Sequence, residues 1–278
     1  MSTPFVINTR FNMYRPVALE RHDRFGRPTD TLEWLERRFQ LFEAYCLPSM
    51  KAQTDQDFSW IVFFSDRTPD KWKARIEAIQ RDFPPFIPVY TKDGEEQPTR
   101  LRTELKRMLH PTDTHVITSR IDNDDAYHRT MVERIRKELA GQDDAYIVFL
   151  NGLQVDIDRR VVAHQRKASN SFLARIGKFG TGDPPTVMDV LHQDVELTGR
   201  SRNIDTDPMW LQVIHSDNVT NDLSSGRVLF TADLQKDFGI VPEVRINVLR
   251  SAWVAVRYRL FVGPANRVKG ILARLFGK

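Results

Sequence analysis

The sequence contains a single cysteine, Cys46, among its 278 residues. One thiol excludes an internal disulfide bond and any zinc site that is built from several cysteines. The sequence also lacks an apolar run of the roughly 18 residues that a membrane-spanning helix requires. Its first residues, MSTPFVINTRF, show no charged leader before a long apolar segment, so we expect no secretory signal. Together these absences predict a cytoplasmic protein.

Acidic residues are scarce at the C-terminal end of the sequence. Residues 243–278 hold eight arginines and lysines against Glu243 alone, which gives this segment a net charge of +7. Because the whole chain carries +4, residues 1–242 carry −3. Positive charge that is confined to one end argues against a nucleic-acid-binding surface on the main body. We therefore expect no nucleic-acid partner.

The chain is long enough to bury a substantial core. Its 278 residues are 41% hydrophobic, which suits one α/β domain with an appendage better than two full domains. We expect the domain over residues 1–242 and a basic, amphipathic helical tail over residues 243–278.

Apolar runs of strand length alternate with helical patterns in the first half. Strands are predicted at residues 5–13, 60–64, 86–90 and 115–121, and the continuous run WIVFF at 60–64 indicates a strand covered on both faces. Helices are predicted at residues 31–45 with Pro48 ending the helix, around residues 72–79, at 99–109 and at about 127–139. This alternation predicts an α/β fold with a single Rossmann-like, mostly parallel sheet flanked by helices. Further strands are predicted at 146–150, 161–163 and 210–215.

The stretch HVITSRIDNDDA, residues 115–126, is an apolar strand that ends in a cluster of acids. Carboxylates at the end of a strand in an open α/β sheet lie on the carboxyl edge, where such folds bind ligands. An Asp-x-Asp pair beside a third carboxylate suits Mg²⁺ or Mn²⁺ that is shared with substrate phosphates. The alternative is a polar turn, because Asp and Asn also favour turns and helix N-caps. The aspartates are denser than one cap requires, and we interpret the stretch as a metal and diphosphate site.

Several patches, taken in their order, carry a resemblance to a known family. They are TRFNM near the start, CLPS at Cys46, QT at Gln53, DFSWIVFFSDRTP, SRIDNDDA and WLQVIHSDN. Over approximately residues 5 to 221 the sequence resembles the rhamnosyltransferase family, whose members resemble glycosyltransferases of the A-type fold. The resemblance implies a nucleotide-sugar half over residues 1–126, an acceptor half over residues 127–242, and a divalent metal on the Asp-x-Asp motif.

The chemistry of glycosyl transfer explains why such a site holds a metal. The departing nucleoside diphosphate gains negative charge as the glycosidic bond breaks, and a divalent cation stabilises that charge. The resemblance implies that Asp124 binds Mn²⁺ or Mg²⁺ directly and that Asp122, the other predicted metal residue of the motif, contacts the ribose or a metal-bound water. Asp125 either supports the site or caps the next helix. Related enzymes often add a later histidine to the metal, and we predict His215 for this role before His192.

Polar residues at the ends of the first strands are candidates for binding the nucleotide. Thr9 and Arg10 end the first predicted strand, and Asp66 follows the second. Arg100 and Arg102 begin a basic helix that either meets phosphate or is a solvated face. Arg120 either meets phosphate or pairs with an aspartate. The nucleotide-binding residues that we predict are Thr9, Arg10, Asp66, Arg102, Arg120, Asp122 and Asn123.

Inversion at the anomeric carbon requires a general base that deprotonates the acceptor hydroxyl. Asp189, His192, Asp194 and Glu196 follow the glycine-rich loop GKFGTGDPP in the acceptor half. Of these we predict Asp189 or His192. A retaining reaction would not use this base.

The tail interleaves apolar residues with arginines, in SAWVAVRYRLFV at 251–262 and VKGILARLF at 268–276. Such helices can lie in a membrane interface with arginines among anionic headgroups. The alternative is a helix that packs on the domain, with its arginine stems covering apolar surface.

These features predict a metal-dependent glycosyltransferase. Its donor would be a nucleoside-diphosphate sugar, with rhamnose as the sugar that the resemblance suggests, and its acceptor a glycan or a lipid-linked sugar. We expect a cytoplasmic enzyme, peripheral at the inner membrane face. The alternatives are a metal-dependent phosphohydrolase and a non-catalytic membrane-associated protein. The first of these normally carries its aspartates near the first strand, whereas DNDDA lies past residue 120.

Overall fold

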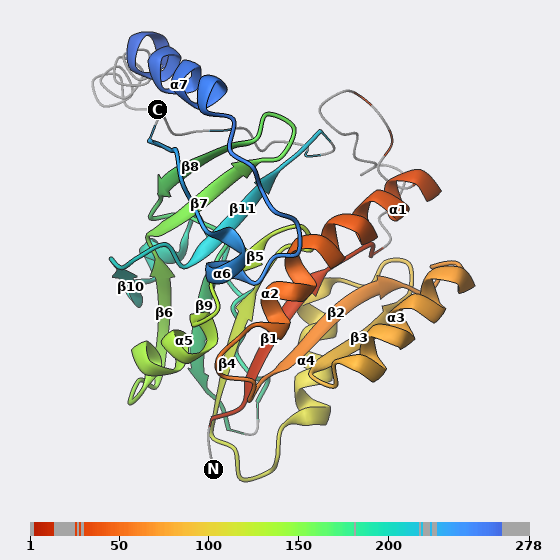
Figure 1. The fold of residues 1–278 in the computed structure, drawn as a ribbon. Coiled ribbons are helices and arrows are strands. Elements are labelled where there is room, and N and C mark those ends of the chain that lie inside the picture. Colours follow the sequence, from red (N-terminus) through yellow and green to blue (C-terminus); the bar gives the residue numbers. More distant parts are fainter. Residues whose placement is uncertain are drawn as a thin grey trace.

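The computed structural model describes residues 3–13, 26, 28, 31–180, 182–216, 218, 223 and 227–262. The chain forms two β-sheets, and the second sheet lies beyond the carboxyl ends of β1 and β4 of the first (Figure 1). Leu150 alone separates β6 from β7, so the chain passes directly from the first sheet into the second.

The first sheet has seven strands. β1, β2, β3 and β4 are parallel, β6 and β10 are parallel to each other, and β9 is antiparallel to both β4 and β6. This arrangement confirms the predicted α/β class with a mostly parallel sheet. The strands in spatial order are β10 (Ser201–Ile204), β6 (Asp144–Phe149), β9 (Leu173–Lys178), β4 (His115–Arg120), β1 (Phe5–Arg10), β2 (Ser59–Ser65) and β3 (Phe86–Thr91).

The second sheet has five strands and was not predicted. β7 pairs parallel with β11 and antiparallel with β8, while the two-residue strands β5 and β12 pair antiparallel at the edges. Pairing between such short, distant segments leaves no periodic signal in the sequence. Their spatial order is β12 (Val228–Leu229), β8 (Val161–Arg166), β7 (Asn151–Asp156), β11 (Trp210–Ile214) and β5 (Ala126–Tyr127).

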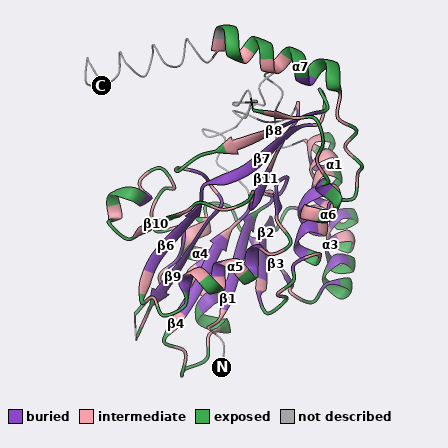
Figure 2. Cartoon of the chain, turned by 60° about the vertical axis from the view of Figure 1, so that its left-hand side comes forward, coloured by how far each residue is buried: buried purple, intermediate pink, exposed green. Residues whose placement is uncertain are grey.

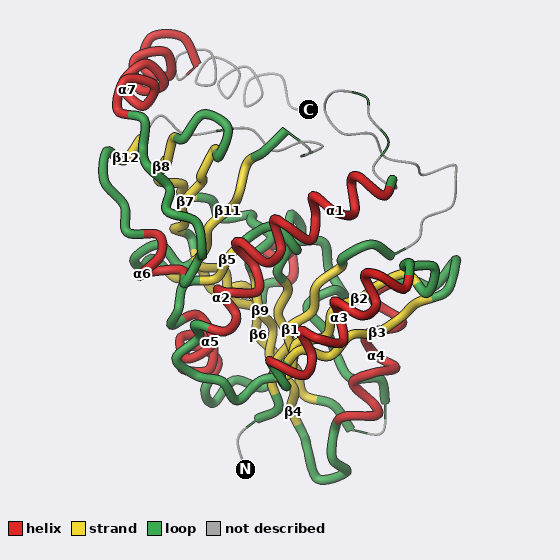
Figure 3. The backbone as a smooth tube through the Cα atoms, turned by 45° about the vertical axis from the view of Figure 1, so that its right-hand side comes forward, coloured by secondary structure: helices red, strands yellow, loops and turns green. Residues whose placement is uncertain are grey.

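Helices cover both faces of the first sheet (Figure 3). Trp60, Val62 and Phe64 of β2 belong to a core with residues of α1, α3 and α5, whereas Ile61 and Phe63 belong to one with residues of α4. The run WIVFF is therefore apolar throughout because both faces of β2 are buried, as predicted. The helical segments are α1 (Leu32–Leu41), the π-helical η2 (Phe42–Cys46), α2 (Leu47–Lys51), α3 (Asp70–Asp82), α4 (Gln97–Met108), α5 (Met131–Leu139), the 3₁₀ turn η3 (Val195–Thr198), α6 (Leu234–Phe238), α7 (Val248–Arg257) and the π-helical η4 (Tyr258–Val262).

The prediction that Pro48 ends the first helix is wrong. α1, η2 and α2 follow one another without a break, and Pro48 lies in the first turn of α2. A proline inside a helix normally leaves the carbonyl four residues earlier without its N–H donor. Here the carbonyl of Ala44 accepts a hydrogen bond from the Val241 N–H instead, at 3.0 Å. A donor from a distant segment thus lets the helix continue.

The helix predicted from about Tyr127 starts later. α5 begins at Met131, and Tyr127 lies in β5, where it pairs with Trp210 of β11. The pairing with β11 holds residues 126 and 127 in an extended conformation, which their sequence alone does not reveal.

Only part of the predicted tail is described. α7 and η4 lie in it, and residues 263–278 are outside the described residues. Val244 and Ile246, beyond the predicted boundary at residue 242, pack against the core of the second sheet. Within the described ranges, no helix is long and apolar enough to cross a membrane.

Candidate functional site at the junction of the two sheets

The turn DNDD, residues 122–125, is held at the carboxyl edge of the first sheet by the neighbouring strands β1 and β4. Asn8 donates to the carbonyl of Ser119 at 2.7 Å, and the Thr9 hydroxyl donates to that of Ile121 at 2.9 Å. The same hydroxyl accepts a hydrogen bond from the indole of Trp60, and Thr9 is fully buried. Thr9, predicted to bind the nucleotide, therefore anchors the turn through its side chain.

Asp124 lies at the centre of a buried polar cluster. Its Oδ2 lies 2.6 Å from Arg38 Nη1, 2.9 Å from His215 Nε2 and 3.3 Å from Asn218 Nδ2. His215 follows β11, so the cluster joins the ends of strands from both sheets. Burial would raise the pKa of Asp124, but the charge of Arg38 and the hydrogen bond with His215 outweigh it and hold the pKa below its usual range. Asp124 is therefore a carboxylate at neutral pH.

Asp125 differs from its neighbour Asp124 in the direction of its pKa shift and in its partner. Its Oδ1 accepts a hydrogen bond from the Val213 N–H of β11 at 2.9 Å, and it is 2% exposed. Burial and the nearby charges of Asp124 and Asp122 raise its pKa well above the usual value. The prediction that Asp125 could cap the next helix is wrong, since Thr130 is the N-cap residue of α5. Asp125 instead ties the turn to the second sheet.

Asp122 is the more accessible member of the predicted Asp-x-Asp pair. Its side chain is 48% exposed, and its Oδ1 accepts a hydrogen bond from Arg120 Nη2 at 3.2 Å.

Burial, followed by the positive charges of Arg120 and Lys167, lowers the pKa of His192. His192 is therefore within electrostatic range of Arg120 and Asp122, and its imidazole is neutral at pH 7.

The other residues predicted at this edge divide into two groups. Asn123 is engaged, because Oδ1 accepts from Arg38 at 3.3 Å and Nδ2 donates to the carbonyls of Arg10 and Phe11. The side chains of Arg10, the last residue of β1, and Asp66, which directly follows β2, are exposed. Because β1 and β2 are parallel neighbours, Arg10 and Asp66 lie on the same edge as the DNDD turn.

Asp189 and Arg102 belong to a different network. The Asp189 carboxylate lies 2.6 Å from Arg102 Nη2 and 2.6 Å from Arg175 Nη1, and it accepts two hydrogen bonds from Thr186. Arg100 pairs with Glu104 one turn along α4, at 2.9 Å. Both carboxylate oxygens of Asp189 are thus engaged.

The predicted metal ligands fit a divalent ion in part. Two ligand atoms that bind one ion at right angles, with bonds of about 2.1 Å, lie about 3.0 Å apart. The distance between Asp124 Oδ2 and His215 Nε2 is 2.9 Å, which is close to that separation. Asp122, the third predicted ligand, is turned to Arg120. No group of three or more His, Cys, Asp or Glu side chains that could hold a metal occurs among the residues that the structure describes. Two protein ligands are enough for a cation that also binds substrate phosphates.

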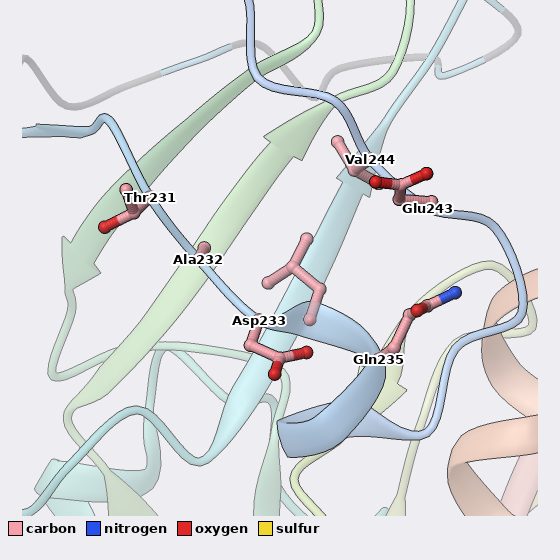
Figure 4. A pocket seen from close by; sticks show the side chains of 7 residues that line it. Thr231, Ala232, Asp233, Gln235, Glu243 and Val244 are labelled. Carbon is pink, nitrogen blue, oxygen red and sulfur yellow. The ribbon is translucent and has the colours of Figure 1, made fainter.

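A pocket of about 600 Å³ lies beside α6, and no member of the Asp124 cluster lines it (Figure 4). It is lined by residues 231–235 with Glu243 and Val244, none of which the sequence predicts as a site residue. The carboxylate of Asp233 in its wall already accepts a hydrogen bond from the Lys236 N–H as the N-cap of α6.

Two members of the Asp124 cluster were missed from the sequence. Arg38 lies on α1, whose pattern predicts only an apolar face, and it precedes Asp124 by 86 positions. Asn218 follows His215 by three residues, and that short spacing was the one available signal. Asp217, between them, lies outside the described residues.

The sequence of residues 9–227 matches a family described as "Putative rhamnosyl transferase". No curated protein matches the chain by sequence. Among solved structures, Staphylococcus aureus TarS 1-349 in complex with UDP-GlcNAc aligns with a TM-score of 0.45 and 10% identity, over 80% of this chain and 62% of TarS. The same protein with UDP aligns with a TM-score of 0.43 and 8% identity, over 76% and 61%. The chain thus spans under two thirds of the length of these proteins.

Proposed function

Because this chain belongs to the rhamnosyl transferase family, whose match covers residues 9–227, we propose that it is a glycosyltransferase that uses a nucleoside-diphosphate sugar. The resemblance found in the sequence is thereby confirmed at the level of the family. The observation that carries the proposal is the meeting of Asp124 and His215, from the ends of strands in two sheets, at 2.9 Å. The carboxyl edge of a parallel sheet is where ligands bind in such folds.

We propose Mn²⁺ as the cofactor, with Mg²⁺ as the weaker alternative, because an imidazole ligand suits Mn²⁺ better than Mg²⁺. Asp124 and His215 would hold the ion, and the donor diphosphate would complete its coordination. When bound, the cation would neutralise the negative charge on the departing diphosphate.

The accessible residues around the cluster would orient the donor. Arg120 presents a guanidinium that is 27% exposed and close to Asp122, which suits contact with phosphate oxygens and with a ribose hydroxyl. Arg10 and Asp66 are exposed at the same edge and would contact the nucleotide. Thr9 and Asn123 would act indirectly, by fixing the turn that carries Asp122 and Asp124.

Of the two predicted bases, we propose His192. Its lowered pKa keeps the imidazole neutral and able to accept a proton at pH 7. Asp189 is held by Arg102 and Arg175, and accepting a proton would disrupt both ion pairs.

We also propose rhamnose as the transferred sugar, from the description of the family, and a glycan or a lipid-linked sugar as the acceptor. An anionic membrane is the third proposed partner, through the basic segment at residues 243–278 with its net charge of +7. The cytoplasmic location stays a prediction.

Calorimetry of donor binding tests the proposal. The full chain is titrated with dTDP-, UDP- and GDP-sugars, each with Mn²⁺, with Mg²⁺ and with EDTA. We expect one nucleotide to bind at least about tenfold more tightly with Mn²⁺ than with EDTA, because the ion bridges protein and diphosphate. Binding without dependence on a cation would reject the metal, and absence of binding to any of these donors would reject the glycosyltransferase.

A further inference from the structure

The outward face of α7 and η4 carries four large apolar side chains that are exposed. Leu249, Trp253, Val256 and Leu260 are 83%, 64%, 48% and 60% exposed. At 3.6 residues per helical turn the three members in α7, Leu249, Trp253 and Val256, fall within an arc of about 60°, and Leu260 follows them in η4. We call these four residues the α7 stripe. A continuous apolar stripe, unlike scattered apolar residues, marks an interaction surface.

Exposed arginines flank the α7 stripe on both sides. By the same helical geometry, Arg250 and Arg257 of α7 lie about 70–90° to one side of the middle of the stripe, and Arg259 of η4 lies on the other side. All three are exposed. Apolar side chains with arginines on both sides are the pattern of a helix that lies flat in a membrane interface.

The opposite face of α7 is attached to the second sheet. Ser251 is fully buried, and the Asn247 N–H donates to the carbonyl of Arg160 at 2.8 Å. Asn247 also caps the helix, since its Oδ1 accepts from the Arg250 N–H at 3.0 Å. Figure 2 shows α7 at the periphery of the molecule, coloured almost entirely as exposed or intermediate. The domain therefore fixes the helix and turns the α7 stripe outward.

We propose that the α7 stripe inserts into the surface of an anionic membrane, with Arg250, Arg257 and Arg259 among the headgroups. Residues 243–278 carry a net charge of +7 with Glu243 as their one acid, which complements an anionic leaflet. A second copy of the chain is the competing occupant. If two copies packed against each other through their α7 stripes, the arginines of both copies would come together, and like charges at such an interface repel.

The α7 stripe is thus the surface that would contact the anionic membrane of the proposed function. The inference rests on that membrane contact and not on the transfer reaction. α7 adjoins β8 and β12 at one edge of the second sheet, and β11, which leads to His215, lies on the other side of β7. A membrane at the α7 stripe would therefore lie on the acceptor half. That placement suits an acceptor that is anchored in lipid.

Vesicle flotation of the full chain tests the stripe. Vesicles of phosphatidylcholine alone are compared with vesicles that contain about 30% phosphatidylglycerol, an anionic lipid. We expect wild type to float with the anionic vesicles and the double variant Leu249→Ser, Trp253→Ser to partition at least about tenfold less. The matched control is Leu197→Ser, because Leu197 is equally exposed, at 83%, on η3. The control should partition like wild type.

Two further measurements separate the membrane from other occupants. Brominated lipids should quench Trp253 fluorescence, judged against Trp253→Phe. The triple variant Arg250→Gln, Arg257→Gln, Arg259→Gln should lose about fivefold in partitioning for each arginine on anionic vesicles and little on neutral ones. Equal flotation of wild type and the double variant, absence of quenching, or a stripe-dependent dimer in light scattering would each overturn the inference. No donor sugar is present, so these results are independent of the transfer reaction.

Discussion

The guanidinium of Arg38 and the carboxylate of Asp124 form an ion pair, with 2.6 Å between Nη1 and Oδ2, across 86 positions of the sequence. Their side chains are 12% and 10% exposed, so each charge has few water contacts and depends on the other. The cation that we propose would bind the same oxygen. Arg38 therefore both stabilises the Asp124 carboxylate and would compete with the ion that we propose.

Arg38→Gln should separate these two effects. Loss of the positive charge should raise Mn²⁺ affinity by about tenfold or more, because repulsion at short range is removed. It should also lower the free energy of unfolding by about 3 kcal/mol, because the buried carboxylate of Asp124 would lose the positive charge that balances it. Calorimetry with Mn²⁺ and urea denaturation measure the two quantities. The control is Arg166→Gln, whose pair with Asp205 is 53% and 63% exposed and should contribute at most about 1 kcal/mol. Unchanged Mn²⁺ affinity in Arg38→Gln would contradict the competition.

Adjacent aspartates should respond differently to the same substitution. Asp124→Asn should abolish Mn²⁺ binding and lower kcat/KM by about 100-fold or more, because the charged ligand is lost. Asp125→Asn should cost less than about 1.5 kcal/mol of stability and leave Mn²⁺ affinity near that of wild type. Burial and the charges of Asp124 and Asp122 raise the pKa of Asp125 and so disfavour its charged form, and an amide oxygen can still accept from the Val213 N–H. Equal loss of Mn²⁺ binding in the two variants would be inconsistent with this division.

The two predicted bases can be told apart by kinetics and stability. His192→Gln should lower kcat by about 100-fold and remove the acidic limb of the pH profile, because proton acceptance is lost. Asp189→Asn should mainly lower the free energy of unfolding, by about 1–3 kcal/mol, because its bonds to Arg102, Arg175 and Thr186 are weakened. A larger loss of kcat in Asp189→Asn than in His192→Gln would reverse the assignment.

Stability should fall as the pH drops below about 6.5, where the unfolded histidines begin to bind protons. Burial lowers the pKa of His128, His164 and His192 in the folded state, so the unfolded state takes up protons first. The lost stability therefore develops between the unfolded pKa and the lower folded values. His128→Asn should flatten this dependence, measured by urea denaturation between pH 5 and 8 as about the range where histidine titrates. The exposed His110→Asn is the control, and an equal slope in both variants would exclude His128 as a source.

Gly152→Ala should disrupt the junction between the sheets. A Cβ at this position of β7 would lie 2.0 Å from the indole of Trp210, which is itself stacked on Phe172 with 4.8 Å between ring centroids. Neither ring has room to shift in a packed core, and we expect a loss of about 1–3 kcal/mol in the free energy of unfolding. Gly180→Ala, with no atom within 4 Å of the added carbon, should be within about 0.5 kcal/mol of wild type. Thermal unfolding of both variants checks this, and equal midpoints would show that the junction tolerates the methyl group.

Local patterns predict most of the first sheet. The run WIVFF predicts a strand buried on both faces, and β2 is such a strand, because unbroken apolar sequence is stable only where both sides are covered. HVITSRI followed by DNDD predicts a strand that ends at the carboxyl edge of the sheet, and β4 ends there at Arg120. These features are legible because each depends on residues close together in the chain. The joint order of the patches likewise identifies the family.

The identity of the partners around Asp124 was decided by the tertiary structure alone. Arg38 and Asn218 approach Asp124 from 86 positions before and 94 positions after it, and no spacing rule connects segments so far apart. The opposite pKa shifts of Asp124 and Asp125 follow from the same cause. Neighbours in sequence, they point into different surroundings, and only the packing of both sheets gives one carboxylate an arginine and leaves the other buried against a backbone N–H. The sequence determined where the acids lie, and the fold determined in which direction the pKa of each is shifted.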